Sequence, residues 1–427
     1  MIRHINTSTA TVRHLYILMC IALTVLTSCK KDDPEKAEPL PQRTVLIYIA
    51  GENNLNSVIK SEMDEMKVGS KSIGNNCLLV YVDGAKSGEL PYLARINEGE
   101  ICDSVSISDM GISSKDEYSS DPAVMESVLR YAFSNHKSEN DDYGLVLWGH
   151  ASGWLIDDSL AYNAMSRMNV SVSGRAKPRK AYGGDTGDNS TSTTGRYWLN
   201  IPTLASLLGK VPHLKFIFAD CCNFQCLENA YELRNVTDYI IGSPAEIPDI
   251  GAPYNTVVPA MFESTTFAES VIDRYYEQAI GGRKTPLSVI KTSGMNDLAA
   301  ATRTALLSFV PTLDSPYPDM TGIIHYYYYY RYHDANNFML KYAPADIYTS
   351  WKQAFDNVVV HRLLSEHWVT NRLWDGYYYD FQVTEETYGG ASMFVPQSPY
   401  VDDYSSYNSN IRKMAWYYAA GLSDVGW

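Results

Sequence analysis

The sequence lacks an excess of basic residues, a long apolar run near its N-terminus and a regular cysteine framework. Its 35 Lys and Arg stand against 49 Asp and Glu, which gives a net charge of -14. An acidic surface repels polyanions, so no nucleic-acid partner is expected. The apolar run "LYILMCIALTVL" (15–26) is too short to span a bilayer as a stable helix. This apolar run must therefore have a role other than spanning the membrane, and the residues around it indicate which.

The N-terminal segment has the pattern of an export signal. Arg3 and Arg13 precede the apolar run, which ends in "LTSC" with small residues before Cys29. The pattern predicts a lipoprotein signal peptide over 1–28, and acylation of Cys29 would anchor the mature chain in a membrane. Residues 29–43 form the expected flexible tether. The acidic residues after Cys29 resemble a surface-export signal of Gram-negative lipoproteins. The expected location is therefore the outer membrane, facing outward, with a periplasmic lipoprotein or an ordinary secreted protein as alternatives.

Between residues 44 and 295 the hydrophobic pattern alternates between buried strands and helices. Near-continuous apolar runs, typical of strands covered on both faces, occur at 44–51, 77–84, 143–150, 215–220, 238–244 and 286–293. Helical periodicity lies between them, as at 121–136, which opens with Asp121 and Pro122. "LARI" (93–96) is expected to be an edge strand. The alternation predicts right-handed crossovers, and hence a mainly parallel central sheet with helices on both faces.

The C-terminal part, 296–427, is predicted to be a mostly helical and aromatic region packed on this core. Its helical stretches and a Gly-opened strand lie at 296–310, 334–342, 346–366 and 388–397. The run "HYYYYYRY" (325–332) is expected to cover a helical or loop surface, with a carbohydrate platform as the alternative.

A long insertion rich in Gly, Ser and Asp, 155–198, is expected to be a functional loop. Its "GGDTGDN" offers hard oxygen ligands, but it lacks the full spacing and the terminal glutamate of a helix-loop-helix calcium site. The sequence therefore assigns no metal ligand there.

Two strands deliver reactive side chains to the same edge of the predicted sheet. His150 ends one of them, and Cys222 follows "KFIFAD". Ligands of parallel sheets bind beyond the carboxyl ends of the strands, and a cysteine nucleophile needs a proton donor such as histidine. Five cysteines follow Cys29, an odd count that suggests a free thiol and not a complete disulfide framework.

The surroundings rank the cysteines in "DCCNFQC" (220–226). Asn223 is predicted to cap a helix that begins just after it, which would place Cys226 on an apolar helix face and Cys222 at the positive end of the helix dipole. By strand alternation Cys221 points the other way. The alternatives are a buried structural thiol or a metal cluster of the three cysteines, although their spacing lacks the paired pattern of zinc sites.

Several stretches together carry a family resemblance. "VLIYIAGENNL", "YGLVLWGHASGW", "FADCCNFQCLENAYEL", "YIIGSPAEIPDIGAPY" and "YGGASMFVP" occur in the order typical of the clostripain family of cysteine peptidases, relatives of caspases, gingipains and legumain. The similarity extends from about residue 44 to 422. It implies a caspase-like α/β/α sandwich over 44–295 and a cysteine endopeptidase that cleaves after Arg or Lys.

The resemblance also implies a role for individual residues. His150 and Cys222 match the catalytic dyad, and backbone N–H groups of Ala151 and Cys222 match the oxyanion hole, although the family often has glycine at the position of Ala151. Asp220 matches the acid that recognises the basic side chain, and Asp249 is a second acid lining that pocket.

The resemblance implies protein or peptide substrates, chemistry that requires no cofactor, and a structural or activating Ca²⁺ as an option. Self-cleavage in the 155–198 loop is expected because that loop contains basic residues, namely Arg167, Arg175, Lys177, Arg179, Lys180 and Arg196. The segment "GENNL" receives no catalytic role. The alternative is a catalytically inactive surface lipoprotein that binds peptide or glycan.

Overall fold

A computed structural model describes residues 39–86, 89–112, 118–156, 182–187, 189–192, 197–327, 330–370, 373–375, 382–398 and 407–427. The predicted signal peptide, Cys29 and the six basic loop residues lie outside these ranges. Residues Pro41–Trp427 form one unit, which is described below.

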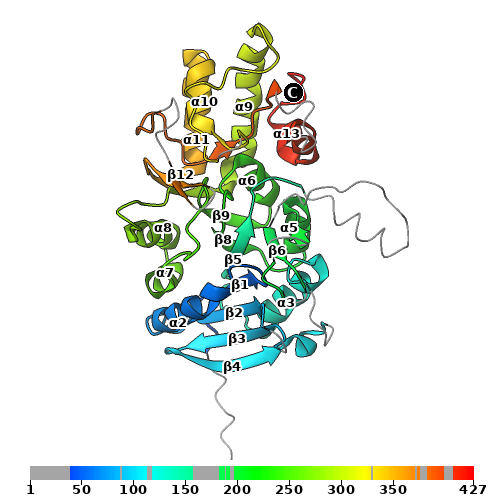
Figure 1. Ribbon diagram of the computed structural model, residues 1–427, viewed down its shortest axis with the longest axis vertical. Helices are drawn as coiled ribbons and strands as arrows, with labels where there is room; N and C mark the ends of the chain where they lie inside the picture. Colours follow the sequence, from blue (N-terminus) through cyan, green and yellow to red (C-terminus); the bar gives the residue numbers. More distant parts are fainter. Residues whose placement is uncertain are drawn as a thin grey trace, which may run out of the picture. The chain divides into compact units, whose positions relative to one another are not determined.

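A central sheet runs through this unit in the order β12-β10-β9-β8-β5-β1-β2-β3-β4 (Figure 1). The strands of this path are β1 (Thr44–Gly51), β2 (Cys77–Gly84), β3 (Tyr92–Asn97), β4 (Glu100–Ser106), β5 (Tyr143–Ala151), β8 (Leu214–Asp220), β9 (Thr237–Gly242), β10 (Leu287–Lys291) and β12 (Val359–Leu363). The five inner strands, from β9 to β2, are parallel. The outer pairs are antiparallel, so the sheet is mixed.

The sheet edges differ from the prediction. "LARI" lies in β3, which is not the edge strand, because β4 pairs with it and forms the edge. At the other side β10 runs antiparallel to β9, and β12 is added outside it. Residues 359–363 were expected to continue a helix, but α11 (Ala345–Val358) ends before them. The C-terminal part thus contributes a strand to the central sheet.

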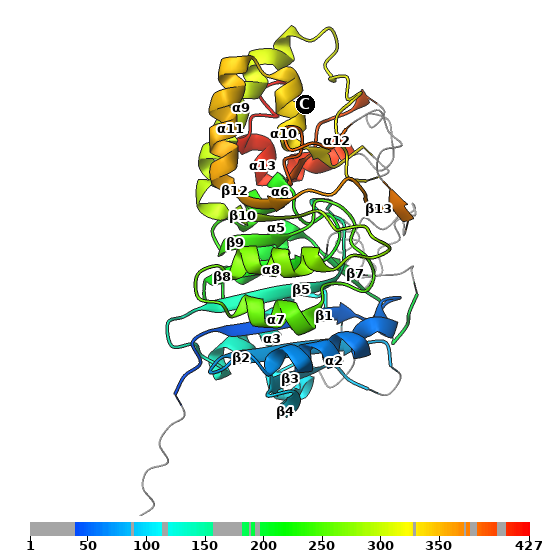
Figure 2. The same ribbon diagram turned by 90° about the vertical axis from the view of Figure 1, so that its left-hand side faces the viewer.

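Helices cover both faces of the sheet. One face carries α2 (Ile59–Ser70), α7 (Tyr254–Met261) and α8 (Phe267–Glu277), which face the viewer in Figure 2. The hydrophobic core on the opposite face contains residues of α3 (Pro122–Asn135), α5 (Ile201–Leu208), α6 (Leu227–Leu233) and α9 (Met295–Phe309). This core continues into α10 (Ala335–Tyr342), α11 and α13 (Ala415–Ala419).

Residues of each buried strand alternate between the two cores. In β1, Leu46 and Tyr48 belong to one core, whereas Val45, Ile47 and Ile49 belong to the other. All of them are fully buried, as the continuous apolar run predicts for a strand covered on both faces.

The described part of the chain also contains smaller strands and the short helix α12. They are β6 (Tyr182–Asp185), β7 (Tyr197–Leu199), β11 (His333–Asp334), β13 (Trp368–Thr370), β14 (Leu373–Asp375), β15 (Ser392–Met393) and α12 (Tyr407–Asn410). The strand expected at 388–397 is thus reduced to β15, which pairs with β11.

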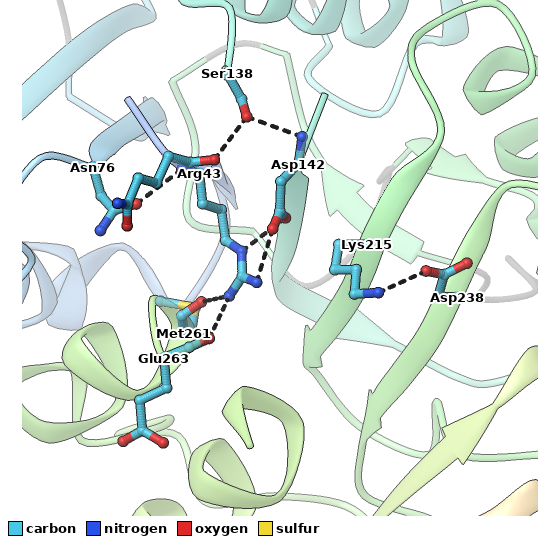
Figure 3. A network of polar contacts seen from close by, with 9 residues as sticks. Arg43, Asn76, Ser138, Asp142, Lys215, Asp238, Met261 and Glu263 are labelled. Atoms are coloured by element: carbon cyan, nitrogen blue, oxygen red, sulfur yellow. Dashed lines mark hydrogen bonds and ion pairs between the residues drawn. The ribbon is translucent and has the colours of Figure 1, made fainter. Parts of the chain in front are cut away.

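A buried ion pair joins the amino ends of two inner strands, β1 and β5. The guanidinium of Arg43 donates two hydrogen bonds to Asp142, of 2.8 and 2.9 Å, and also donates to the carbonyl oxygens of Met261 and Glu263 (Figure 3). The same group lies 4.5 Å from the ring centroid of Phe267. These contacts join the starts of β1 and β5 to the end of α7, at the edge opposite the carboxyl ends of the strands.

Candidate active site

His150 lies at the carboxyl end of β5 and is partly exposed. The preceding Gly149 has a φ of 142°, and an added Cβ would meet the carbonyl oxygen of Ala50 at 2.9 Å. A side chain at that position would therefore be strained. After the histidine, the backbone pairs with β6, where His150 lies opposite Gly183 and Ala151 opposite Tyr182. The His150 backbone is consequently held by β6.

Asn54 holds the His150 side chain. Its Oδ1 lies 3.0 Å from Nε2 of His150. The turn that presents Asn54 follows β1 and is shaped by buried Asn53, whose side chain donates to Ala50 and accepts from the N–H of Leu55. This segment is "GENNL", to which the sequence interpretation gave no role. One signal could have indicated a role for this segment. It directly follows β1, which is the neighbour of β5 in the sheet.

Cys222 follows β8 and is the partly exposed member of the cysteine cluster. Cys221 and Cys226 are both fully buried, and burial raises the pKa of each thiol well above its usual range. Both thiols therefore stay protonated and are shielded from solvent. Their surroundings leave Cys222 as the cysteine of this cluster that a substrate can reach.

The predicted helix start after Cys222 is wrong. Asn223 adopts a left-handed φ of 54°, and α6 begins only at Leu227, with Cys226 in the N-cap position. Backbone bonds explain the difference, because the N–H groups of Asn223 and Gln225 donate to Ala245 and Ser243 and not to a helix. The helix dipole is consequently not adjacent to Cys222.

One cavity of about 580 Å³ contains both reactive side chains. It is formed by the loops after β1, β5, β8 and β9. Its lining residues are Asn54, Leu55, Ser57, Val58, Trp148, Gly149, His150, Ala151, Ser152, Asp220, Cys222, Glu246, Ile247, Pro248, Asp249, Ile250, Gly251, Ile280, Tyr327 and Val369. All five site residues predicted for the chemistry and the specificity are in this list. None of the described lining residues is Lys or Arg.

Asp220 is a buried acid of this cavity, with 2% of its surface exposed. Its Oδ2 accepts hydrogen bonds from the N–H of Ala252 at 3.1 Å and from the hydroxyl of Tyr254 at 2.9 Å. Burial disfavours the charged form and raises the pKa of Asp220 to about 6, although these hydrogen bonds act in the opposite direction. Asp249 lines the same cavity but is exposed to solvent.

The tyrosine run contacts the loop after His150. Tyr332 is fully buried and donates its hydroxyl hydrogen to the carbonyl oxygen of Ser152, while the indole of Trp154 donates to the carbonyl oxygen of Arg331. Tyr326 is also buried and donates to Asp334. The packing interpretation of this run is therefore correct for Tyr326 and Tyr332, whereas Tyr330 is 47% exposed and Tyr327 lines the cavity.

A second acidic group lies behind the turn that carries Asn54. Carboxylate oxygens of Glu52, Asp83 and Asp185 all lie within 4.8 Å of one another, and the three residues are buried. Among the described residues this is the group that could hold a metal ion. Asp185 is the first aspartate of "GGDTGDN", and Glu52 accepts hydrogen bonds from the next residues of that motif, Thr186 and Gly187.

Comparisons with known proteins decide the family. The model of the clostripain family matches residues 47–425. The chain belongs to the clostripain family. This clostripain-family chain is a cysteine peptidase, a hydrolase with the caspase-like α/β fold, and its substrates are proteins or peptides.

Solved structures agree with this assignment. A secreted C11 cysteine protease from Bacteroides thetaiotaomicron, in complex with an irreversible peptide inhibitor, is 28% identical, with a TM-score of 0.68 over 90% of this chain and 99% of that chain. An inactive zymogen C11 protease from Parabacteroides distasonis has the same fold at 24% identity, with a TM-score of 0.68 and coverage of 90% and 99%. A comparison with curated proteins gives no match.

The export prediction is not addressed by the described part of this clostripain-family chain. Within the described ranges, no helix combines the length and the apolarity that crossing a membrane requires. The structural relative from Bacteroides thetaiotaomicron is described as secreted.

Proposed function

We propose that this cysteine peptidase is an endopeptidase that cleaves after Arg or Lys, with Cys222 as the nucleophile and His150 as the proton donor. The observation that carries the proposal is the composition of one cavity. Cys222, His150 and the buried carboxyl of Asp220 line the same space, and its described lining contains acids without a Lys or Arg. A cationic side chain that enters this cavity therefore supplies a positive charge opposite the negative charge of the acids.

The proposed reaction proceeds through a thioester. The Cys222 thiolate attacks the carbonyl carbon after the basic residue, and backbone N–H groups of Ala151 and Cys222 stabilise the oxyanion. His150 then donates a proton to the departing amine, and water hydrolyses the thioester. Asn54 keeps the imidazole oriented through its hydrogen bond to Nε2.

Of the three acids that line the cavity, Asp220 and Asp249 have different parts in the proposed specificity. Asp220 lies at the end of β8, two residues before the nucleophile, and its buried carboxyl meets the end of the basic side chain. Asp249 is exposed at the same cavity and attracts the cation as it enters. Because exposed charges are screened by salt, Asp249 contributes less than Asp220.

Fluorogenic peptides that end in Arg, Lys, citrulline or Gln before the cleaved bond test the proposal. Under reducing conditions we expect turnover of the Arg and Lys peptides only, and loss of turnover in Cys222→Ala. Cys102→Ala is the matched control, because Cys102 is an exposed thiol on the edge strand β4. Equal turnover of the citrulline peptide would contradict the specificity. No turnover of any peptide would favour the inactive binding protein.

We further propose that residues 1–28 are removed and that Cys29 is acylated, which places the enzyme at the outer membrane of a Gram-negative bacterium through the tether 29–43. The pattern "LTSC" before the polar tether supports this. Cell fractionation of wild type and Cys29→Ser tests it, and protease treatment of intact cells tests surface exposure. A Cys29→Ser protein that stays in the membrane fraction would contradict the anchor.

Self-processing in the 155–198 loop is a separate proposal. Its support is the set of six basic residues in that loop, which an enzyme specific for Arg or Lys would recognise. We expect wild type to appear as two fragments on a denaturing gel and Cys222→Ala as one intact chain. If both proteins remain intact, the proposal is wrong.

The proposed chemistry needs no cofactor, but we propose a structural or activating Ca²⁺ held by Glu52, Asp83 and Asp185. Calcium prefers hard oxygen ligands, and the three clustered carboxylates provide them. Treatment with EDTA should lower the melting temperature, and calcium should restore it better than magnesium. An unchanged melting temperature would contradict the proposal, whatever the activity does.

A further inference from the structure

Trp198, in β7, packs beside the imidazole of His150. The centroids of the two rings are 6.5 Å apart, and the ring planes are inclined by 48°. This distance is within the range of about 4.5–7 Å over which aromatic rings interact. Trp198 is only 1% exposed and does not belong to the described lining of the cavity. The indole therefore contacts His150 from a position that a bound substrate does not reach.

The pairing of β5, β6 and β7 explains this contact. His150 lies opposite Gly183 of β6, and Gly183 lies opposite Trp198 of β7. The three residues consequently form one row across the three strands. Residues in such a row are the ones whose side chains can meet. Because the middle residue is a glycine, no side chain of β6 separates the indole from the imidazole.

The next residue, Gly184, leaves the space that the indole occupies. Its φ is 80°, and an added Cβ would lie 2.6 Å from Cη2 of Trp198. Gly183 has a φ of 95°. Both conformations favour glycine, and at 184 any larger residue would also displace the ring. The two glycines that open "GGDTGDN" therefore place Trp198, which gives this motif a role that does not involve a metal.

Trp198 adds a second restraint to the one that Asn54 provides. The hydrogen bond from the Asn54 side chain restrains one nitrogen of the imidazole, but a single bond leaves the ring free to tilt about that atom. Asn54 belongs to the turn after β1, whereas Trp198 belongs to β7, so the two contacts come from different elements. A proton donor needs both the right distance and the right orientation, which two contacts can fix together.

We propose that Trp198 is a positioning residue, which holds the imidazole of His150 in the orientation that proton transfer to the departing amine requires. The inference rests on the proposed function, because that function makes His150 the proton donor. Trp198 acts on the reaction through His150 and does not contact the substrate. Its replacement should therefore change kcat and leave KM nearly unchanged.

Steady-state kinetics of the full chain with an Arg peptide test this inference. Trp198→Ala should lower kcat by about 10- to 100-fold, because a misoriented donor loses part of the roughly 10²–10⁴ that general acid–base catalysis contributes. Trp198→Phe keeps an aromatic ring and should retain most of the kcat. Trp351→Ala is the matched control, because Trp351 is an equally buried tryptophan in α11. It should lower the melting temperature without a comparable loss of kcat. Equal losses of kcat in the two alanine variants would overturn the inference.

Indole fluorescence gives a readout that needs no turnover. A protonated imidazole quenches a neighbouring indole, so emission of the full chain carrying Cys222→Ala should fall as His150 gains its proton. The chain has 8 tryptophans, and the difference from Trp198→Phe in the same background isolates the one beside His150. This pH-dependent difference should vanish when His150→Gln is present.

The His150→Gln comparison is needed because other titratable residues lie nearby. They are Tyr182 and Asp185 of β6, and Asp220, Glu246, Asp249 and Tyr327 of the cavity. All of them remain in the His150→Gln protein. If the pH-dependent difference persists there, it comes from one of these groups and the inference is wrong. The fluorescence result decides the inference should Trp198→Ala fail to fold.

The outcomes separate this inference from the proposed function. If wild type cleaves Arg and Lys peptides and Trp198→Ala retains its kcat, the inference is wrong and the proposed function stands. If wild type cleaves no peptide, the proposed function is wrong, and the role of Trp198 in proton transfer is wrong with it.

Discussion

The Oδ1 atom of Asn54 lies 3.0 Å from Nε2 of His150, and this contact joins the turn after β1 to the end of β5. A carbonyl oxygen can only accept a hydrogen bond, so the contact keeps a proton on Nε2. It follows that Nδ1 is the ring nitrogen that exchanges a proton during the proposed reaction.

Replacement of Asn54 tests this assignment. Asn54→Ala should lower kcat by about 10- to 100-fold, part of the 10²–10⁴ that a positioned acid–base group contributes, while KM changes little. Asn54→Asp retains the acceptor and adds a negative charge, which stabilises the imidazolium. The alkaline limb of its pH–rate profile should therefore move to higher pH. A profile that coincides with wild type would show that Asn54 does not act on His150.

The inner strands of the sheet were predictable from the sequence, and the reason is their continuous apolar character. The strands at 44–51 and 77–84 agree with β1 and β2 at both ends. The sheet edges were not predictable, because an apolar pattern does not state strand direction. β10 and β12 run antiparallel to their neighbours through long-range pairing that leaves no local signal.

The candidate site, like the sheet, was predictable from the sequence only in part. His150 and Cys222 follow strong strand signals, so their shared location could be inferred before the structure. The start of α6 could not be inferred, because the left-handed conformation of Asn223 depends on a backbone bond to Ala245.

Glu228 should make stability depend on pH. It is fully buried, and burial raises its pKa from 4.5 to about 7. A raised carboxyl pKa means that the folded chain retains a proton which the unfolded chain loses. The contribution of Glu228 to stability is therefore fully present below about pH 4.5 and is lost as pH rises to about 7, a change of about 3 kcal/mol.

Glu228→Gln removes this titration, and its oxygen can still accept the hydrogen bond from the N–H of Phe394. Thermal unfolding at pH 5 and pH 8 measures the effect. The melting temperature of the variant should fall less between these two values than that of wild type. An equal fall in both proteins would mean that Glu228 is not the group responsible.

Arg43 should stabilise the fold without affecting catalysis. Its pair with Asp142 is largely buried, so Arg43→Ala leaves a carboxylate without its partner and should lower the free energy of unfolding by about 3 kcal/mol. Lys215→Ala is the control, because its pair with Asp238 is more exposed, at 37% and 45%, and should contribute less than about 1 kcal/mol (Figure 3). Urea titration measures both. Similar losses in the two variants would contradict the role assigned to burial.

Tyr332 should influence catalysis through the loop that follows His150. Tyr332→Phe removes the donor to the carbonyl oxygen of Ser152, which then lies buried without that bond and loosens the loop. We expect kcat to fall several-fold, by about the factor of 5 that 1 kcal/mol represents, with KM nearly unchanged.

Tyr326→Phe provides the comparison for that variant. Tyr326 belongs to the same run, is equally buried and also loses a hydroxyl hydrogen bond, but its acceptor is Asp334 at the start of α10. Both variants should therefore lose stability, measured by thermal unfolding, whereas only Tyr332→Phe should lose kcat. If the two variants lose kcat equally, the tyrosine run acts on the fold in general. If only Tyr332→Phe does, its hydroxyl connects the C-terminal part to the loop that follows His150.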